Sequence, residues 1–321
     1  MQNYEVNNPI LISGGEGFIG SSLVKKLIDL NIPVIVIDNN ITSYPLKIKN
    51  SLYSKIETDV SYIDINKIPK VSGIIHLASV AAPLVYMKEP LSVINPNTLG
   101  TRKMIDIAKR DNVRLLYAST SEVYGHLSPK IIGVDKISEN ENSHISLLTK
   151  RSSYAAAKRL GEELILNYIK RGGDATNLRL FNVYGLGMDK KNIGYGRVVP
   201  NFFHKMSKDE AIDIYGDGEQ VRSFTWIDDV ARAIFDLLFL KRSLPTAINI
   251  GNQESVTINK LADLISKILG VPYEINYKSR EKDDPMWRRP SNTLIKKLIN
   301  WSPKISLIEG LNLIAKEGNY V

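Results

Sequence analysis

The chain has 321 residues, a net charge of +8 and no cysteine, which excludes disulfide bonds and thiolate chemistry. This length can bury a large core and is long for one simple domain. No apolar run approaches the ~20 residues that span a bilayer, and the polar start at residues 4–8 lacks the apolar stretch of a signal peptide. We therefore expect a cytoplasmic protein with no membrane partner.

The excess of 42 lysines and arginines over 34 aspartates and glutamates has three readings. It can reflect a lysine-rich solvated surface, an anionic substrate or a nucleic-acid partner, in that order of preference. The basic residues are scattered, and no patch combines them with aromatic side chains. The sequence therefore predicts no nucleic-acid partner.

Strand and helix patterns alternate from the N-terminus to about residue 180. Short apolar runs predict buried strands at residues 10–12, 34–37, 74–78, 115–119 and 177–181. Helical periodicity follows the first strand through residue 30 and returns over residues 91–110 and 154–171. This βαβ repetition predicts an α/β fold with a Rossmann-type doubly wound parallel sheet.

Beyond Gly185 the pattern loosens into loops, short helices and short strands. We expect one domain over residues 1–185, to which some later segments return, and a smaller mixed α/β C-terminal lobe over residues 186–321. Ligands bind at the carboxyl ends of the strands in such sheets, so the lobe is expected there. The polar stretch 129–151 predicts a long loop. Four bulky side chains are expected to pack in the interior: His76, Trp226, Trp287 and Trp301.

A glycine-rich turn links the first strand to the first helix. Gly14 permits the tight turn, Gly17 lets the backbone approach a pyrophosphate, and Gly20 lets the helix pack on the strand. The free N–H groups of the helix N-terminus suit phosphates. The second strand ends at Asp38, where a carboxylate can bind a ribose 2′-OH and would repel a 2′-phosphate. The sequence therefore predicts an NAD site and no metal site.

Tyr154 and Lys158 stand four residues apart in the helix predicted over residues 154–171, so they share one face. An ammonium beside a phenol favours the phenolate and lowers the pKa of the tyrosine toward the range of a general base. Such a pair can take a proton from a sugar hydroxyl while a neighbouring acceptor removes the hydride.

These motifs resemble the extended short-chain dehydrogenase/reductase family, the NAD-dependent nucleotide-sugar epimerases and dehydratases. Matching segments run in order through residues 14–20, 38–39, 59–60, 76–79, 97–101, 119–125, 154–158, 179–185, 215–222 and 249–251. The resemblance implies a nucleotide-sugar substrate, residues 1–185 as the NAD-binding domain and residues 186–321 as mainly the nucleotide-sugar lobe. It implies cofactor contacts from Gly14, Gly17, Phe18, Ile19, Gly20, Asp38, Asn39, Asp59, Val60, Leu77, Ala78, Ser79, Asn97, Tyr154 and Lys158.

Within the family, five segments look most like the group that decarboxylates UDP-glucuronate. They are residues 76–90, the Ser-Thr-Ser-Glu run at 119–122, Arg151, residues 196–202 and residues 283–290. Glu16 in the glycine turn, Ala155-Ala156-Ala157 and Ser291 depart from that group's pattern. Glu16 is expected to bring a negative charge near the pyrophosphate unless it points to solvent. The resemblance implies a UDP-sugar bound by Pro83, Tyr86, Asn182, Arg197, Val198, Tyr215, Gln220, Arg222 and Arg288.

The resemblance also assigns a catalytic set: Thr120, Ser121, Glu122, Tyr154, Lys158 and Arg288. Tyr154 would take the proton from O4 while NAD accepts the hydride from C4, and Thr120 would polarise the ketone. Glu122, Ser121 and Arg288 would act around the C5 carboxylate. In an alternative reading, Arg288 pairs with Asp283, Asp284 or the UDP phosphates.

Two other functions stay open at this point. One is a nucleotide-sugar 4,6-dehydratase or 4-epimerase, and the other is a catalytically silent NAD-binding regulator. The resemblance also implies a homodimer formed through the helices over residues 91–110 and 154–171.

Overall fold

A computed structural model describes residues 6–127, 133, 135–142, 145, 149, 152–188, 197–280, 284–318 and 320. The chain forms two compact units. The first comprises Met1–Thr120, Ser153–Arg179 and Ala231–Ile248, and the second comprises Ser121–Ser152, Leu180–Val230 and Asn249–Val321. Residues 121–152 and 180–185 precede the boundary expected from sequence, and they group with the second unit.

The first unit is built on a seven-stranded sheet, in the order β11-β6-β5-β4-β1-β2-β3. Its strands are β1 (Ile10–Ser13), β2 (Val34–Asp38), β3 (Tyr53–Glu57), β4 (Gly73–His76), β5 (Leu115–Thr120), β6 (Ala175–Leu180) and β11 (Ala247–Ile250). β1 pairs in parallel with both β2 and β4, so the strand order reverses beside it. The predicted Rossmann-type sheet is confirmed, and its carboxyl edge beside β1 is where such folds bind ligands.

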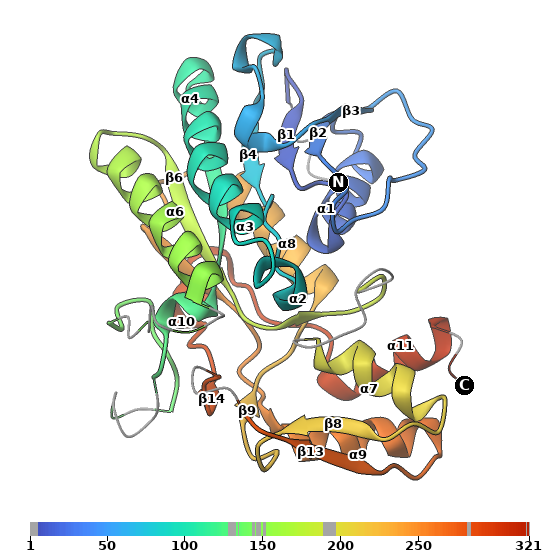
Figure 1. Ribbon diagram of the computed structural model, residues 1–321. Coiled ribbons are helices and arrows are strands. Elements are labelled where there is room, and N and C mark those ends of the chain that lie inside the picture. The colour runs from blue at the N-terminus through green and yellow to red at the C-terminus, as the bar shows by residue number, and fades with distance from the viewer. Residues whose placement is uncertain are drawn as a thin grey trace. The chain divides into compact units, whose positions relative to one another are not determined.

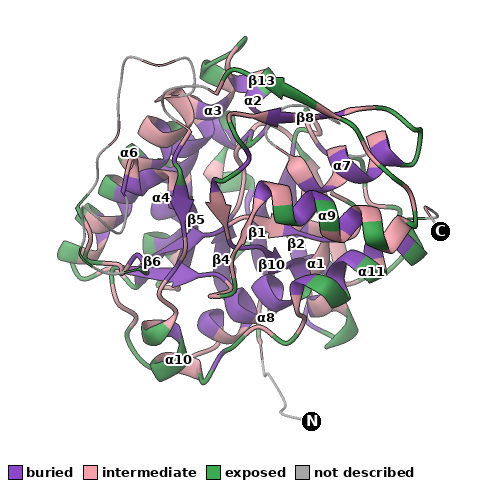
Figure 2. Ribbon diagram, turned by 90° about the horizontal axis from the view of Figure 1, so that it is seen from below, coloured by how far each residue is buried: buried purple, intermediate pink, exposed green. Residues whose placement is uncertain are grey.

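Helices cover both faces of this sheet because its strands are apolar on both sides. One face carries α4 (Thr101–Asp111) and α6 (Ser152–Lys170), which lie side by side (Figures 1 and 2) and meet where Lys109 sits over the ring of Tyr168. The opposite face carries α1 (Phe18–Asp29) and α8 (Ile227–Leu238), where Lys26 sits over the ring of Phe235.

The helix predicted over residues 91–110 has three parts: α3 (Leu91–Asn95), a π-helical turn (Pro96–Gly100) and α4. The short helices of the first unit are α2 (Pro83–Tyr86) and the 3₁₀ turns η1 (Val60–Tyr62) and η2 (Ile65–Lys67). His76 is buried between Ser13, Pro96 and Thr101, and burial lowers its pKa to about 3. This confirms a packing role for His76.

The second unit is a mixed α/β lobe, as predicted. Its strands are β7 (Val183–Tyr184), β8 (Ile212–Tyr215), β9 (Val221–Arg222), β10 (Thr225–Trp226), β12 (Val256–Thr257), β13 (Ile275–Lys278) and β14 (Trp287–Arg288). Its helices are the 3₁₀ turn η4 (Ser121–Tyr124), α7 (Val198–Met206), α9 (Ile258–Leu269), α10 (Thr293–Ile299) and α11 (Leu307–Glu317). Trp226, Trp287 and Trp301 are buried, as expected. In the described part of the chain, no helix has both the length and the apolar character needed to cross a bilayer.

Gly161 sets how closely α6 approaches β5. A Cβ at this position would lie 2.1 Å from the hydroxyl of Tyr117 and 2.9 Å from the carbonyl of Asn97. We predict that Gly161→Ala lowers the free energy of unfolding by about 1–3 kcal/mol, because overpacking shifts the helix. Urea unfolding measures this change.

The control for Gly161→Ala is Lys25→Ala. Lys25 lies on α1, on the other face of the sheet, and its side chain is exposed. Its loss should change the free energy of unfolding by less than about 0.5 kcal/mol. Equal stabilities of the two variants would contradict the close approach of α6 to β5.

Candidate active site

The glycine-rich turn, where the sequence predicts a pyrophosphate, leaves no room for a side chain at Gly14 or Gly20. Gly14 has a φ of +73°, and a Cβ there would lie 2.7 Å from the backbone nitrogen of Ala78. A Cβ on Gly20 would lie 2.2 Å from the carbonyl oxygen of Gly14. Gly17 caps α1 without a side-chain hydrogen bond, so the backbone N–H groups of Phe18 and Ile19 begin the helix uncovered by a cap. The turn therefore fits a dinucleotide phosphate.

Asp38 lies at the carboxyl end of β2, next to this turn. Its Oδ2 accepts a hydrogen bond from the Glu16 backbone (3.0 Å), and its Oδ1 accepts from Asn40 N and Ser43 Oγ, both at 2.9 Å. Asn39 donates to Asp59 at 3.0 Å, and Asp59 accepts from the backbone of Ser61 beside Val60. The predicted adenosine-side residues thus lie on connected segments after β2 and β3.

Glu16 brings a carboxylate into the glycine-rich turn, and an ion pair compensates its charge. Its side chain is fully buried and forms an ion pair with Lys55 at 2.7 Å. It therefore neither points to solvent nor leaves an uncompensated charge beside the turn. The negative charge expected from sequence is present, and Lys55 compensates it.

The carboxyl end of β4 adds the next set of predicted cofactor residues. Leu77 donates its backbone N–H to Ser13 at 2.9 Å, which keeps Leu77 and Ala78 beside the glycine turn. Asn97, in the π-helical turn, donates to Ser79 at 2.9 Å and accepts from Tyr117 at 2.8 Å. These residues converge on the same edge of the sheet as Gly14.

Lys158 is buried on α6 and donates to the carbonyl of Ala118 on β5 at 2.6 Å. Burial lowers its pKa to about 7, although the nearby Glu162 acts in the opposite direction. The ring of Tyr154, one turn earlier, stacks on Tyr86 with 5.4 Å between the ring centroids. Thr120 is the last residue of β5, the strand whose Ala118 carbonyl accepts the hydrogen bond from Lys158. The first unit therefore brings together the predicted proton-transfer residues and the predicted substrate residues Pro83 and Tyr86 of α2.

Sequence reasoning missed Glu162, which joins the two elements that carry these residues. Glu162 accepts from Ser119 at 2.7 Å and from two nitrogens of Arg179, each at 2.8 Å. Arg159 adds a bond of 3.0 Å. The available signal was its spacing, since Glu162 follows Tyr154 and Lys158 at helical intervals of four residues.

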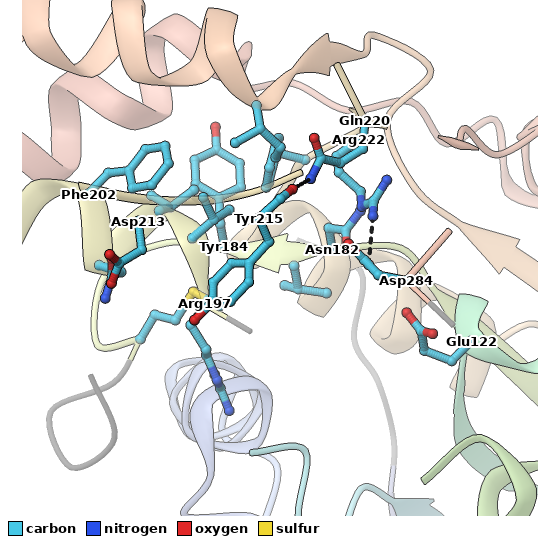
Figure 3. A pocket seen from close by; sticks show the side chains of 17 residues that line it. Glu122, Asn182, Tyr184, Arg197, Phe202, Asp213, Tyr215, Gln220, Arg222 and Asp284 are labelled. Atoms are coloured by element: carbon cyan, nitrogen blue, oxygen red, sulfur yellow. Dashed lines mark hydrogen bonds and ion pairs between the residues drawn. The ribbon is translucent and has the colours of Figure 1, made fainter. Parts of the chain in front are cut away.

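The second unit contains a pocket of about 330 Å³, within the usual size of small-molecule sites. It gathers seven predicted site residues: Glu122, Asn182, Arg197, Val198, Tyr215, Gln220 and Arg222 (Figure 3). Arg222 donates to Asp284 at 2.9 Å, and the Gln220 amide donates to the carbonyl of Tyr215. The pocket is lined by two arginines and three carboxylates beside aromatic and amide groups. Its arginines suit the phosphates of a nucleotide diphosphate.

Arg288 on β14 is 1% exposed, and its Nη2 lies 3.8 Å from Oε2 of Glu122, which lines the pocket. Its Nε and Nη1 have no hydrogen-bond partner among the described residues. Burial lowers the pKa of Arg288, with Glu122 opposing that effect. Asp284 pairs with Arg222, while Asp283, Arg151 and Gly196 lie outside the described residues. A buried guanidinium that lacks partners for two nitrogens in the described part of the chain suits an incoming anion.

Comparisons with known proteins agree with this geometry. The model of the NAD dependent epimerase/dehydratase family matches residues 10–251. The chain is 36% identical over 311 residues to UDP-glucuronic acid decarboxylase 1 of Xenopus tropicalis, covering 94% of this chain and 70% of that protein. It is 35% identical over 321 residues to UDP-glucuronic acid decarboxylase 5 of Arabidopsis thaliana, covering 97% and 89%.

Two solved structures are also similar over nearly the whole chain. UDP-glucose 4-epimerase of Thermotoga maritima with UDP-glucose has a TM-score of 0.86 at 30% identity, covering 97% of this chain and 98% of that one. MoeE5 in complex with UDP-glucuronic acid and NAD has a TM-score of 0.83 at 25% identity, covering 98% and 100%. With a family match over most of its length, the chain belongs to the NAD-dependent epimerase/dehydratase family.

Proposed function

We propose that this enzyme converts UDP-glucuronate to UDP-xylose and CO₂ through a 4-keto sugar. The observation that supports this best is the buried Arg288, with two nitrogens unpaired among the described residues, next to Glu122. A substrate carboxylate is the bidentate partner that a guanidinium suits. Relatives named UDP-glucuronic acid decarboxylase, at 36% and 35% identity, support the same choice.

The first unit would hold NAD, which accepts a hydride from C4 of the sugar when bound and later returns it. The turn of Gly14, Gly17 and Gly20 would follow the pyrophosphate, and Asp38 would bind the adenosine ribose. Lys158 would bind the nicotinamide ribose. The remaining contacts would come from Phe18, Ile19, Asn39, Asp59, Val60, Leu77, Ala78, Ser79 and Asn97.

Tyr154 would take the proton from O4 as C4 is oxidised. The ammonium of Lys158, where protonated, favours the phenolate that this step needs. The hydroxyl of Thr120 would donate a hydrogen bond to O4 and stabilise the negative charge that develops there. When C4 is reduced again, Tyr154 would return the proton to O4.

Oxidation at C4 places the C5 carboxylate β to a ketone. The C5–carboxyl bond then breaks, CO₂ leaves, and the electron pair left on C5 delocalises onto the ketone oxygen as an enolate. Arg288 would orient the carboxylate until it leaves. Glu122 and Ser121 would serve the step in which C5 regains a proton.

The second unit would hold the UDP end of the substrate. Arg222 would bind the diphosphate and share its charge with Asp284, its present partner at 2.9 Å. Tyr215 and Gln220 would flank the nucleotide, with Asn182, Arg197 and Val198 completing the site.

The test is to incubate the purified protein with UDP-glucuronate and NAD and to identify the product by NMR spectroscopy. We expect UDP-xylose together with an equal amount of CO₂. Unchanged UDP-glucuronate, alongside turnover of another UDP-sugar, would overturn the proposal.

A 4-epimerase is the second candidate because the solved UDP-glucose 4-epimerase has a TM-score of 0.86 with this chain. That likeness concerns the fold, which both activities share, whereas Arg288 and Glu122 concern the sugar carboxylate. The same NMR experiment separates the two: an epimerase would give UDP-galacturonate and release no CO₂.

We also propose a homodimer through α3, α4 and α6, and a cytoplasmic location. Leu91 of α3, Leu99 of the π-helical turn before α4 and Leu160 of α6 are exposed, and a second copy would cover them. Leu99→Asp with Leu160→Asp should convert a dimer to a monomer in light scattering. Tyr277→Asp, at an exposed tyrosine of β13, is the control and should leave the dimer intact. Fluorescence microscopy of the tagged full chain tests the location.

A further inference from the structure

Glu16 occupies a position in the glycine-rich turn that a small side chain could fill, yet its carboxylate collects four donors. Oε1 accepts from the backbone of Leu46 at 2.7 Å and from the hydroxyl of Tyr53 at 3.0 Å. Oε2 accepts from the amide of Asn40 at 2.7 Å and pairs with Lys55 at 2.7 Å. Each oxygen therefore has two partners, which is what a buried carboxylate needs.

These partners come from two segments that follow β2. Asn40 and Leu46 belong to the connection over residues 39–52, in which no helix or strand is formed. Tyr53 and Lys55 belong to β3, the edge strand of the sheet. Through Asn40 and Leu46, Glu16 bonds the fourteen-residue connection to the glycine turn. Through Tyr53 and Lys55, it also bonds to β3.

Residues of the same connection also donate hydrogen bonds that orient the side chain of Asp38. The backbone of Glu16 donates to one oxygen of Asp38, while Asn40 and Ser43 donate to the other. Asn40 links the two acids, because its backbone N–H donates to Asp38 and its side-chain amide donates to Glu16. The amide oxygen of Asn40 also accepts from Lys55 at 2.6 Å. Asn40 also adopts a left-handed backbone with a φ of +53°, which the bonds around it hold in place.

The network also keeps Glu16 from repelling phosphates. Burial works to raise the pKa of Glu16, but the bonds from Lys55, Asn40, Leu46 and Tyr53 outweigh it and lower the pKa. The carboxylate is therefore ionised, and Lys55 compensates its charge at 2.7 Å. The nearby glycine N–H groups keep their ability to bind an anion.

We propose that Glu16 is a positioning residue for NAD. It holds residues 39–52 and Asp38 in the arrangement that receives the adenosine half of the cofactor, so NAD binds without first ordering this connection. A protein whose binding-competent arrangement is less populated binds its ligand more weakly in proportion. The inference concerns the NAD site alone and holds whether the sugar reaction is decarboxylation or epimerisation.

The experiment compares Glu16→Ala with the wild-type chain by calorimetric titration of the NAD-free protein with NAD. We expect the Kd of NAD to rise about tenfold or more, because four donors lose their acceptor and the connection opens. Trypsin should then cleave after Lys47 and Lys49, both exposed in this connection, faster than in the wild type and with less protection by NAD. The Kd of UDP should stay unchanged.

Glu57→Gln is the matched control. Glu57 also pairs with Lys55, at 2.9 Å, but its side chain is 70% exposed. It should leave the Kd of NAD within about twofold of the wild type.

Should Glu16→Ala fail to fold, Tyr53→Phe removes a single donor and should still raise the Kd of NAD severalfold. An unchanged Kd of NAD and unchanged trypsin cleavage in the soluble variant would overturn the proposal. So would a parallel rise in the Kd of UDP, which would indicate general damage.

Discussion

Replacing Tyr154 by phenylalanine should lower kcat by about 10²- to 10⁴-fold, the usual contribution of a general acid–base group. The phenyl ring can keep its stacking on Tyr86, at 5.4 Å between centroids, so the change removes the hydroxyl and little else. Hydride transfer from C4 then has no base for the O4 proton. Rapid-mixing absorbance of NADH after addition of UDP-glucuronate measures this step directly.

Tyr86→Phe is the control for Tyr154→Phe. Tyr86 presents a second phenol in the same ring stack but lies on α2, away from Lys158 in the chain. Its kcat should fall by less than about tenfold, because a binding contact is not a general base. The Kd values of NAD and UDP for Tyr154→Phe should match the wild type. Retention of more than a tenth of the wild-type kcat would remove Tyr154 from the mechanism.

Arg288→Met should abolish most UDP-xylose formation without destabilising the fold. Losing a charged donor that faces a reacting carboxylate lowers the rate by about 10²- to 10³-fold. The guanidinium is 1% exposed, and two of its nitrogens have no hydrogen-bond partner among the described residues. An apolar side chain of similar length should therefore be neutral or stabilising. Product formation and urea unfolding, measured on the same preparation, test both halves of the prediction.

A purely structural Arg288 would behave in the opposite way, since its removal would destabilise the protein. Arg289→Met provides the comparison at the next position. Arg289 binds the carbonyl of Gln253 at 2.7 Å and pairs with Asp135, and the substrate assignment does not include it. It should keep nearly full activity. Equal losses in the two variants would argue against a substrate carboxylate at Arg288.

The strands and the proton-transfer pair could be predicted because their signals are local. The apolar run Val34–Ile37 forms β2 together with Asp38, and the four-residue spacing of Tyr154 and Lys158 places both on α6. Glycine positions and the acid at the end of β2 follow fixed offsets, so they too were found from sequence.

What escaped prediction depends on partners far along the chain. The compensation of the Glu16 charge could not be predicted, because Lys55 lies 39 positions later and no local pattern links the two residues. Glu162 was overlooked because Arg179 and Ser119 reach it from β6 and β5. The π-helical turn at Pro96–Gly100 was read as ordinary helix, since one extra residue in a turn leaves no periodic signal.

The boundary between the two compact units falls at the peptide bond between Thr120, in the first unit, and Ser121, in the second. On the proposed assignment, Thr120 assists the oxidation at C4, whereas Ser121 and Glu122 assist the reprotonation at C5 after CO₂ has left. Substitutions after this bond could redirect the product while the redox half of the reaction persists. An engineer wishing to change the product sugar would therefore vary Glu122 and Arg288 and leave β5 and α6 untouched.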